Sequence, residues 1–250
     1  MRLKDQSAIV TGAASGFGAA IAERFAAEGA RVVVADLNEA QGQEVAQRIG
    51  GVFARCDVSR AEDVQALVQI AVRAHGRLDV VVNNAGVTHV NKPHLDVTED
   101  EFDRLYRVNV KSLFHMNRAA VPAMRANPGG SSGVFINVAS TTGVRPGPGL
   151  CWYSGSKGAV ITTSKGLALE LARENIRVCV VNPMIGETAM LEQFMGMPDT
   201  PENRQRFLAR IPLGRFTQPA DVAGAAVYLA SDEAGFLTGV CLDVDGGRNI

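Results

Sequence analysis

Short apolar runs alternate with helical stretches along nearly the whole chain, and this alternation constrains the fold more than any other feature. The runs are rich in Val and Ile and almost continuously apolar, as is typical of strands that helices cover on both faces. Strands that alternate with helices form βαβ units, in which the strands are parallel. The runs occupy residues 7–12, 30–36, 51–58, 78–86, 132–140, 176–183 and 239–247. The sequence therefore predicts an α/β fold: a Rossmann-like, doubly wound parallel sheet of seven strands with helices on both faces.

The length and composition predict one domain that spans residues 1–250. Of the 250 residues, 46% are hydrophobic and 20% are charged, which is ordinary for a globular chain that buries a large core. The net charge is -1 and there is no basic run, so we expect no nucleic-acid partner. No apolar run is long enough to span a membrane, and the N-terminus lacks the apolar core of a signal peptide.

The four cysteines are scattered and form no CxxC pair. Sparse, unpatterned cysteines indicate reduced thiols, so we expect a cytoplasmic protein without a disulfide framework. No cluster of His, Cys and carboxylate residues has metal-ligand spacing, so no metal site is predicted.

A glycine-rich loop, TGAASGFG, follows the first strand and opens a helix. Glycines let a backbone turn tightly and approach a ligand closely, and the start of a helix offers free N–H groups to an anion. This arrangement favours binding of a pyrophosphate. The residues expected to contact the cofactor here are Gly12, Ser15, Gly16, Phe17 and Gly18.

Asp36 ends the second strand, 20 residues after Gly16. A carboxylate at that place accepts hydrogen bonds from both hydroxyls of an adenosine ribose and repels a 2′-phosphate. Neither Ser15 nor Leu37 is basic. We therefore expect NAD(H) rather than NADP(H) as the cofactor.

Tyr153 and Lys157 stand four residues apart in CWYSGSKGAV. On a helix this spacing places both side chains on one face. We expect the ammonium group to lower the pKa of the phenol, which would make Tyr153 a proton donor and acceptor near neutral pH. By themselves the two residues are equally compatible with the exposed face of an amphipathic helix.

The region from Gly186 to Arg215 is less regular and holds several Met and Pro residues. It follows the sixth strand, at the edge of the sheet where open α/β folds bind ligands. We interpret it as a lid-like insertion over a substrate site, and the alternative is a packing excursion with no such role.

Taken together, these motifs resemble those of the short-chain dehydrogenase/reductase family, in its single-domain branch, and the resemblance covers essentially the whole chain. The spacing of Gly12, Gly16 and Gly18 matches this family. Further family motifs follow in order along the chain: Asp57-Val58, the NNAG segment with Asn84 and Gly86, Asn109, Ser140, Tyr153 with Lys157, and Thr188.

The resemblance implies an NAD(H)-dependent oxidoreductase that interconverts a secondary alcohol and a ketone. Tyr153 would be the general acid/base, and Lys157 would tune its pKa and bind the nicotinamide ribose. Ser140 would hold the substrate oxygen, and Asn109 would anchor a water that relays protons from Lys157. Asp57, Val58, Asn84, Gly86 and Thr188 would contact the cofactor. The alternatives are a non-catalytic dinucleotide sensor and an epimerase or dehydratase on the same scaffold.

The chain departs from the family pattern after the sixth strand. The usual Pro-Gly-x-Ile-x-Thr is here Pro183-Met184-Ile185-Gly186-Glu187-Thr188. Met184 replaces a glycine, and Gly186 stands where isoleucine is common. Phe17 also occupies a position where a smaller aliphatic residue is frequent.

By family position, the substrate pocket would include Thr142, Leu150, Trp152 and Met184, with His94 nearby. His89 and His94 could face a substrate or be ordinary core or surface residues, and Arg145 could hold a carboxylate or sulfonate or be solvated. The candidate substrates are small-molecule alcohols and ketones: secondary alcohols, sugars or cyclic polyols, and 3-oxoacyl thioesters. Members of this family are commonly homotetramers, and we expect the same here.

Overall fold

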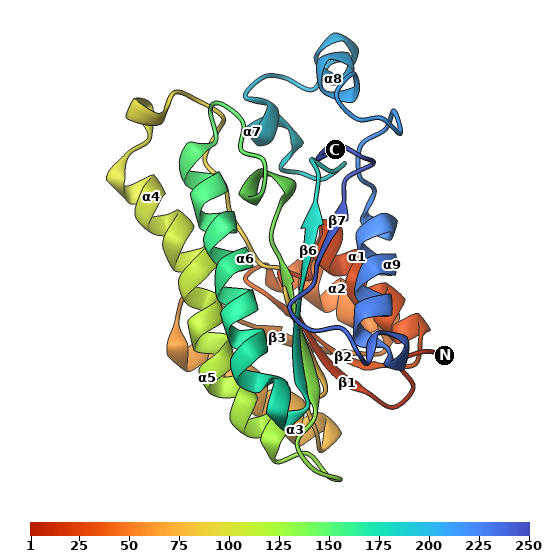
Figure 1. Ribbon diagram of the computed structural model, residues 1–250. Coiled ribbons are helices and arrows are strands. Elements are labelled where there is room, and N and C mark those ends of the chain that lie inside the picture. The colour runs from red at the N-terminus through yellow and green to blue at the C-terminus, as the bar shows by residue number, and fades with distance from the viewer.

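The computed structural model describes all residues from 1 to 250 and contains one seven-stranded sheet (Figure 1). All neighbouring strands are parallel, in the order β3-β2-β1-β4-β5-β6-β7, which confirms the predicted fold class. The strands are β1 (Ser7–Thr11), β2 (Arg31–Asp36), β3 (Val52–Arg55), β4 (Val80–Asn83), β5 (Gly133–Val138), β6 (Ile176–Pro183) and β7 (Cys241–Val244).

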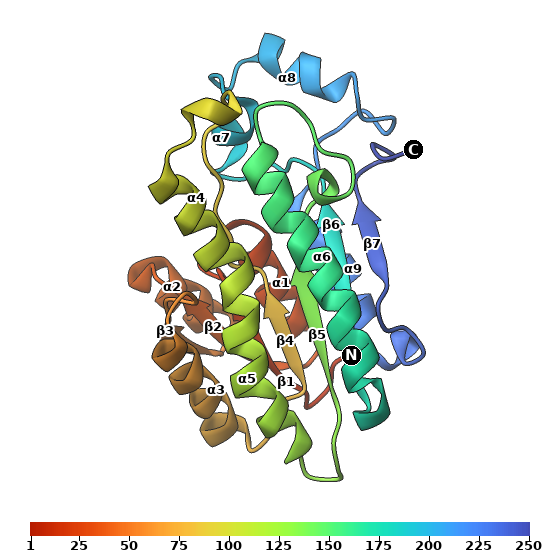
Figure 2. The ribbon, with the colours of Figure 1, turned by 60° about the vertical axis from the view of Figure 1, so that its left-hand side comes forward.

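Helices cover both faces of the sheet (Figures 1 and 2). One face is covered by α1 (Gly16–Ala27), α2 (Glu39–Ile49) and α9 (Pro219–Ala230). The other face is covered by α3 (Ala61–His75), α5 (Ser112–Arg125) and α6 (Cys151–Leu171), with α4 (Glu99–Tyr106) leading into α5.

The two hydrophobic clusters explain why the strands are apolar almost throughout. Successive residues of a strand point to opposite faces. Ile9 thus packs into the cluster beneath α3 and α5, whereas its neighbours Ala8 and Val10 pack beneath α1 and α9. Both faces are buried, so most positions of either set are apolar, and buried polar residues such as Asn137 form side-chain hydrogen bonds.

The direction of the winding reverses at β1. From β1 the chain builds outward through β2 to β3, and it then returns to place β4 on the other side of β1. The carboxyl ends of β1 and β4 therefore border a crevice, which is where open α/β sheets bind ligands. The glycine-rich loop and the NNAG segment follow these two strands.

Three successive helical elements, α4, a π-helical turn and α5, form one long helix from Glu99 to Arg125. The helix is continuous in direction, but residues Arg107–Lys111 between α4 and α5 form a π-helix. A π-helical turn adds a residue to the turn and is frequent at functional sites. Asn109 lies in the middle of this turn and is buried.

Residues 186–215, here called the cap segment, lie beyond the carboxyl ends of the strands (Figure 1). The segment contains two short helices, α7 (Leu191–Met195) and α8 (Pro201–Leu208). Its own small cluster of four buried residues is formed by Leu191, Met195, Ile211 and Phe216. None of the helices in the structure combines the length and apolar character that crossing a membrane requires.

Candidate active site

One large cavity, with a volume of about 1130 Å³, runs along the carboxyl ends of the strands beneath the cap segment. At one end it is bounded by Asp36 and Asp57, and at the other by the cap segment and residues near the C-terminus. Nearly all residues predicted to bind the cofactor or to act in catalysis line it. The exceptions are Gly18 and Asn109, which lie directly behind its wall.

The phosphate loop (residues 12–18) has a shape that only glycine permits at three positions. Gly12 and Gly16 have φ values of 62° and 56°, in the left-handed region that favours glycine. A Cβ on Gly18 would lie 2.1 Å from the carbonyl oxygen of Gly12, and one on Gly12 would lie 2.8 Å from Cα of Ala85. The loop is therefore pressed against both α1 and the start of the NNAG segment.

Hydrogen bonds of the Thr11 and Asn84 side chains hold the phosphate loop in place. The hydroxyl of Thr11 accepts hydrogen bonds from the backbone N–H groups of Asn84 and Ala85 and donates to the carbonyl of Val82. The side-chain amide of Asn84 donates to the carbonyls of Thr11 and Gly12. Asn84 thus ties the ends of β1 and β4 together at the switch point.

The N-terminus of α1 suits a pyrophosphate. Ser15 stands at its cap position but makes no side-chain capping hydrogen bond, and the first turn holds no acidic residue. The free N–H groups and the positive end of the helix dipole therefore face the cavity without an internal partner.

Asp36 is held in place by backbone groups. One carboxylate oxygen accepts from the N–H of Ala14 at 2.9 Å, and the other accepts from the N–H of Asn38 at 2.9 Å. Each oxygen retains acceptor capacity for a ribose hydroxyl. Among the residues that line this end of the cavity none is basic, which fits an unphosphorylated ribose.

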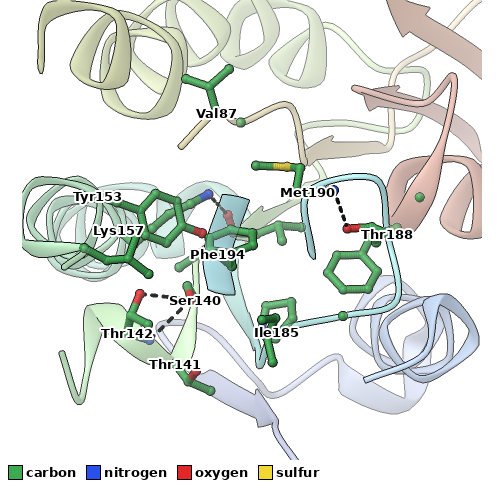
Figure 3. A pocket seen from close by; sticks show the side chains of 18 of the residues that line it. Val87, Ser140, Thr141, Thr142, Tyr153, Lys157, Ile185, Thr188, Met190 and Phe194 are labelled. Carbon is green, nitrogen blue, oxygen red and sulfur yellow. Dashed lines mark hydrogen bonds between the residues drawn. The ribbon is translucent and has the colours of Figure 1, made fainter. Parts of the chain in front are cut away.

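The remaining predicted cofactor residues line the same cavity. Asp57 is anchored because its carboxylate accepts from the N–H of Ser59, and Val58 beside it is buried. A Cβ on Gly86 would stand 3.3 Å from both Asn109 Oδ1 and Lys157 Nζ, so the glycine keeps this part of the wall open. Thr188 Oγ1 accepts from the N–H of Met190 (Figure 3).

Tyr153, Lys157 and Ser140 come together in the middle of the cavity (Figure 3). Tyr153 and Lys157 lie one turn apart on α6 and are both 5% exposed, with the ammonium 5.9 Å from the centre of the phenol ring. Lys157 Nζ donates to the carbonyl of Val138 at 2.8 Å, which leaves two of its protons for ribose hydroxyls. Ser140 Oγ accepts from the N–H and the hydroxyl of Thr142, so its own proton remains available to a substrate oxygen.

The expectation that Lys157 lowers the pKa of Tyr153 is wrong for the protein without its cofactor. Burial raises the pKa of Tyr153 above its ordinary value, and the interaction with Ser140 opposes this to a smaller extent. Burial also lowers the pKa of Lys157 to about 8. Both shifts have the same cause, because a site with little water disfavours the charged form of either group.

Asn109 is bound more firmly than its predicted role suggests. Its side-chain amide donates to the carbonyl of Val87 and to the hydroxyl of Ser156, and its oxygen accepts from the N–H of Val87. Both amide protons are therefore used, and only one lone pair of Oδ1 is free to hold a water. The π-helical turn places this side chain against the segment that follows β4.

Three of the four predicted substrate-pocket residues line the cavity, namely Thr142, Leu150 and Met184. Trp152 does not, and this prediction is corrected. Its indole donates to the carbonyl of His94, and its ring packs edge-on against Phe102 at 5.4 Å. It follows Cys151 at the start of α6, and its direction differs from that of Tyr153 by about 100° around the helix. His89 and His94 do not line the cavity either.

The sequence predicts a lid over the site but not which of its residues face the cavity, and it gives no signal for Arg248. Phe194 of α7 packs against the ring of Tyr153, with ring centres 5.2 Å apart, so the cap segment touches the predicted acid/base directly (Figure 3). Arg210 and Arg248 also line the cavity. Arg145 donates to the carbonyl of Arg248, which brings a loop before α6 and a segment near the C-terminus together. Only the folded chain makes these distant residues neighbours.

Comparison with known proteins identifies the class that this fold and site define. A family model described as enoyl-(acyl carrier protein) reductase, which is one of the short-chain dehydrogenase/reductase models, matches residues 12–249. The chain belongs to the short-chain dehydrogenase/reductase family, as its motifs predict, and it is an oxidoreductase.

Particular relatives match over their full length. The chain is 61% identical over 255 residues to 4-formylbenzenesulfonate dehydrogenase of Comamonas testosteroni, with 100% of both chains covered. A solved 3-ketoacyl-(acyl-carrier-protein) reductase from Brucella melitensis in complex with NADH is 43% identical, with a TM-score of 0.93 and coverage of 99% of this chain and 100% of that one. A 7α-hydroxysteroid dehydrogenase solved with NADH and a 7-oxo bile acid conjugate is 35% identical, with a TM-score of 0.90 and coverage of 98% and 95%. Both solved structures contain NADH, the cofactor that Asp36 predicts.

Proposed function

We propose that this NAD-dependent oxidoreductase acts on a small aromatic substrate that carries its reactive hydroxyl or carbonyl at one end and an anionic group, such as a sulfonate, at the other. The observation that carries the proposal is the distribution of charge in the cavity. Its only acidic lining residues, Asp36 and Asp57, lie at the adenosine end. The opposite end is cationic.

Apart from Lys92, the cationic side chains at the substrate end form no ion pair with a carboxylate. Lys92 pairs with Glu101, but Arg104, Arg107, Arg145, Arg210 and Arg248 form no ion pair with a carboxylate side chain. The chain segments that carry three of these residues adjoin one another, and we call the three residues the arginine junction (Arg145, Arg210 and Arg248). Arg145 donates to the carbonyl of Arg248, and Gly246, two residues earlier, packs against Ile211, next to Arg210.

An arginine cluster of this kind recognises planar or tetrahedral oxyanions through paired N–H donors. The relative from Comamonas testosteroni is named for a substrate with an aldehyde and a sulfonate on one ring. The two facts point to the same substrate class.

The residues of the site would act on such a substrate as follows. The catalytic set consists of Ser140, Tyr153 and Lys157, with Asn109 behind them. Ser140 donates a hydrogen bond to the reacting oxygen and Tyr153 takes the proton of the substrate hydroxyl during oxidation. The cofactor, when bound, would supply the acceptor for the hydride that leaves the carbon bearing this hydroxyl. An aldehyde reacts as its hydrate, whose carbon bears both a hydroxyl and a hydrogen, and the product is a carboxylic acid.

The cofactor would be held by residues that fit it on structural grounds. The glycines of the phosphate loop and the open N-terminus of α1 receive the pyrophosphate, Asp36 the adenosine ribose, and Lys157 the nicotinamide ribose. The sensor alternative has no observation in its favour, because the whole catalytic set faces one cavity and the relatives carry enzyme names.

The test compares two aldehydes that differ only in charge. Reduction of NAD+ is followed by absorbance with 4-formylbenzenesulfonate and with benzaldehyde. We expect kcat/KM to be about tenfold or more higher for the sulfonate, since a charge-assisted hydrogen bond contributes at least that factor. Arg248→Met should remove most of this preference. Arg104→Met, which deletes the same charge from the opposite wall, should leave it.

Equal kcat/KM for the two aldehydes would contradict the proposed substrate class. Loss of the preference in Arg104→Met and not in Arg248→Met would move the anion site to the α4 wall. Measuring NADP+ beside NAD+ tests the role of Asp36 in the same assay.

We also propose the homotetramer expected from the family. Large apolar side chains are exposed on the outer faces of α5 and α6, where Phe114 is 56% and Leu169 is 83% exposed. Such residues are typical of surfaces that another subunit covers. Sedimentation velocity at micromolar concentration should show a tetramer, and a monomer would contradict this. The cytoplasmic location stays a prediction.

A further inference from the structure

Phe17 and Gly186, two residues that depart from the family pattern, are 169 positions apart in the chain but adjacent in the structure. Phe17 is larger than the usual residue of the phosphate loop, and Gly186 is smaller than the isoleucine that is common at its position. A Cβ on Gly186 would lie 2.3 Å from Cζ and 2.8 Å from Cε1 of Phe17. The edge of the phenylalanine ring thus fills the space that a side chain at position 186 would occupy.

The backbone at Gly186 does not itself require glycine. Gly186 is absent from the residues with positive φ, so its backbone conformation is open to any L-residue. It is buried, and it forms a parallel bridge to Thr217, with Glu187 N–H donating to the Thr217 carbonyl at 3.1 Å. A Cβ at position 186 would also lie 3.1 Å from the carbonyl oxygen of Thr217, but its two shortest contacts would be with the ring of Phe17, so the absence of a side chain mainly makes room for that ring.

The contact lies between the two parts of the cofactor site. Phe17 lines the cavity from the second residue of α1 and also packs against the core beneath that helix. Gly186 opens the cap segment, and its carbonyl accepts from the N–H of Thr188 at 2.9 Å. A Cβ on Gly16 would meet Cγ2 of Thr188 at 3.4 Å, so two successive residues of the phosphate loop face the start of the cap segment.

We propose that Phe17 and Gly186 are a complementary pair of positioning residues that set the distance between the phosphate loop and the start of the cap segment. The pair fixes Thr188 relative to the helix N-terminus that receives the pyrophosphate. It therefore determines how tightly the dinucleotide is bound, whatever the substrate is.

The test uses a double-mutant cycle with NADH binding as the readout, followed by nicotinamide fluorescence without substrate. Gly186→Ala adds a methyl group where the ring lies, and overpacking of this kind should raise the Kd for NADH about tenfold. Phe17→Leu, which removes the ring edge, should raise the Kd only about two- to fivefold. The double variant should bind NADH about as tightly as Phe17→Leu and more tightly than Gly186→Ala, because the smaller side chain makes room for the methyl group.

A matched control exists elsewhere in the chain. A Cβ on Gly42 of α2 would lie 2.2 Å from the ring of Phe53 in β3, and Phe53 does not line the cavity. Gly42→Ala should lower the melting temperature while leaving the Kd for NADH within about twofold of wild type, because overpacking there strains only the α2–β3 contact.

The proposal is overturned if Gly186→Ala binds NADH as wild type does, or if the double variant binds no better than Gly186→Ala alone. If Gly186→Ala does not fold, an unchanged Kd in Phe17→Leu overturns it. Since no substrate is present, these outcomes are independent of the proposed anionic substrate.

Discussion

The phosphate loop and the cap segment border the same cavity, but they are built in different ways. The loop is fixed by its backbone: two of its glycines have left-handed φ, a third leaves no room for a Cβ, and Thr11 and Asn84 bind it from below. The cap segment rests on four buried side chains, and its helix α8 has no buried residue at all.

The difference follows from what each region has to bind. A pyrophosphate is recognised by backbone N–H groups, whose positions leave little choice of residue. A substrate is recognised by side chains, and apolar Met and Phe side chains can be exchanged or repacked at small cost. Segments with few buried contacts also open locally at lower free energy than the core does. The cap segment is therefore the part of the site in which specificity can change without loss of the cofactor.

The largest expected effect comes from a residue in the cavity between the two regions, which the cap segment contacts directly. Tyr153→Phe removes the hydroxyl that exchanges a proton with the substrate while the ring still packs on Phe194. We expect kcat to fall about 10³-fold, within the range that general acid–base catalysis contributes. NADH should bind with an unchanged Kd by fluorescence titration. A variant that keeps a tenth of the activity would remove Tyr153 from the catalytic role.

The next prediction tests whether the phosphate loop excludes side chains at its glycine positions, as its geometry indicates. Gly18→Ala places a methyl group 2.1 Å from the Gly12 carbonyl oxygen, so the loop must move. We expect the Kd for NADH to rise about 100-fold or more, or the protein to lose stability by about 3 kcal/mol.

Gly166→Ala on α6 is the matched control, because a Cβ there meets no atom within 4 Å. Alanine in an open helical position stabilises by about 0.5–1 kcal/mol relative to glycine. Urea unfolding and NADH titration of both variants check the contrast. Equal behaviour of the two variants would show that the loop is not constrained by sterics.

A smaller effect is expected for the cap segment. Phe194→Leu keeps an apolar side chain but loses the edge-to-face contact with Tyr153, which contributes about 1 kcal/mol. We expect KM for the substrate to rise about threefold to tenfold, while the Kd for NADH changes less than about twofold. Steady-state kinetics measure the change in KM, and NADH titration measures the change in the Kd. A larger change in the Kd than in KM would mean that the cap segment acts mainly on the cofactor.

The last prediction concerns the stability of the fold and not activity or binding: the pKa of Lys157 is lowered by burial to about 8 from its ordinary value of 10.5. Below about pH 8 the folded protein keeps a charged ammonium in a buried site, and this cost to stability is complete there. Between the two pKa values the unfolded chain binds more protons than the folded one, so the unfolding free energy rises with pH in that window and the cost is gone above it.

Lys157→Met is the reference that lacks this titration. Urea unfolding of both proteins at about pH 7, about pH 9 and about pH 10.5 should show wild type gaining stability relative to the variant as the pH rises. A difference that is constant with pH would mean that the pKa of Lys157 is not lowered in the fold.

The fold was predictable because it depends on a pattern that the chain repeats. Each strand must be apolar on both faces, and each βαβ connection has one preferred hand, so the seven runs and the order of the elements leave few alternatives. The phosphate loop and Asp36 were predictable for a similar reason, since both depend on residues adjacent in sequence to a strand end. The proposed catalytic set could be named because its motifs resemble those of the family.

The failures lie where neighbours in sequence are not neighbours in space. Trp152 is next to Tyr153 but points away from the cavity, because successive residues of a helix differ in direction by about 100°. The pKa of Tyr153 depends on burial by the whole fold, including Phe194 from the cap segment, and not on Lys157 alone. The arginine junction joins three segments that have no shared motif.

The class of fold and the cofactor therefore follow from the amino-acid sequence, because short-range spacing and strand-end positions suffice for these, and the roles proposed for the catalytic residues follow from the resemblance to the family. The tertiary structure decided the depth of burial around Tyr153 and Lys157, the charge of the substrate end, and the contact between Phe17 and Gly186. These properties arise from long-range packing, in which each side chain's surroundings are supplied by segments that the local sequence does not specify.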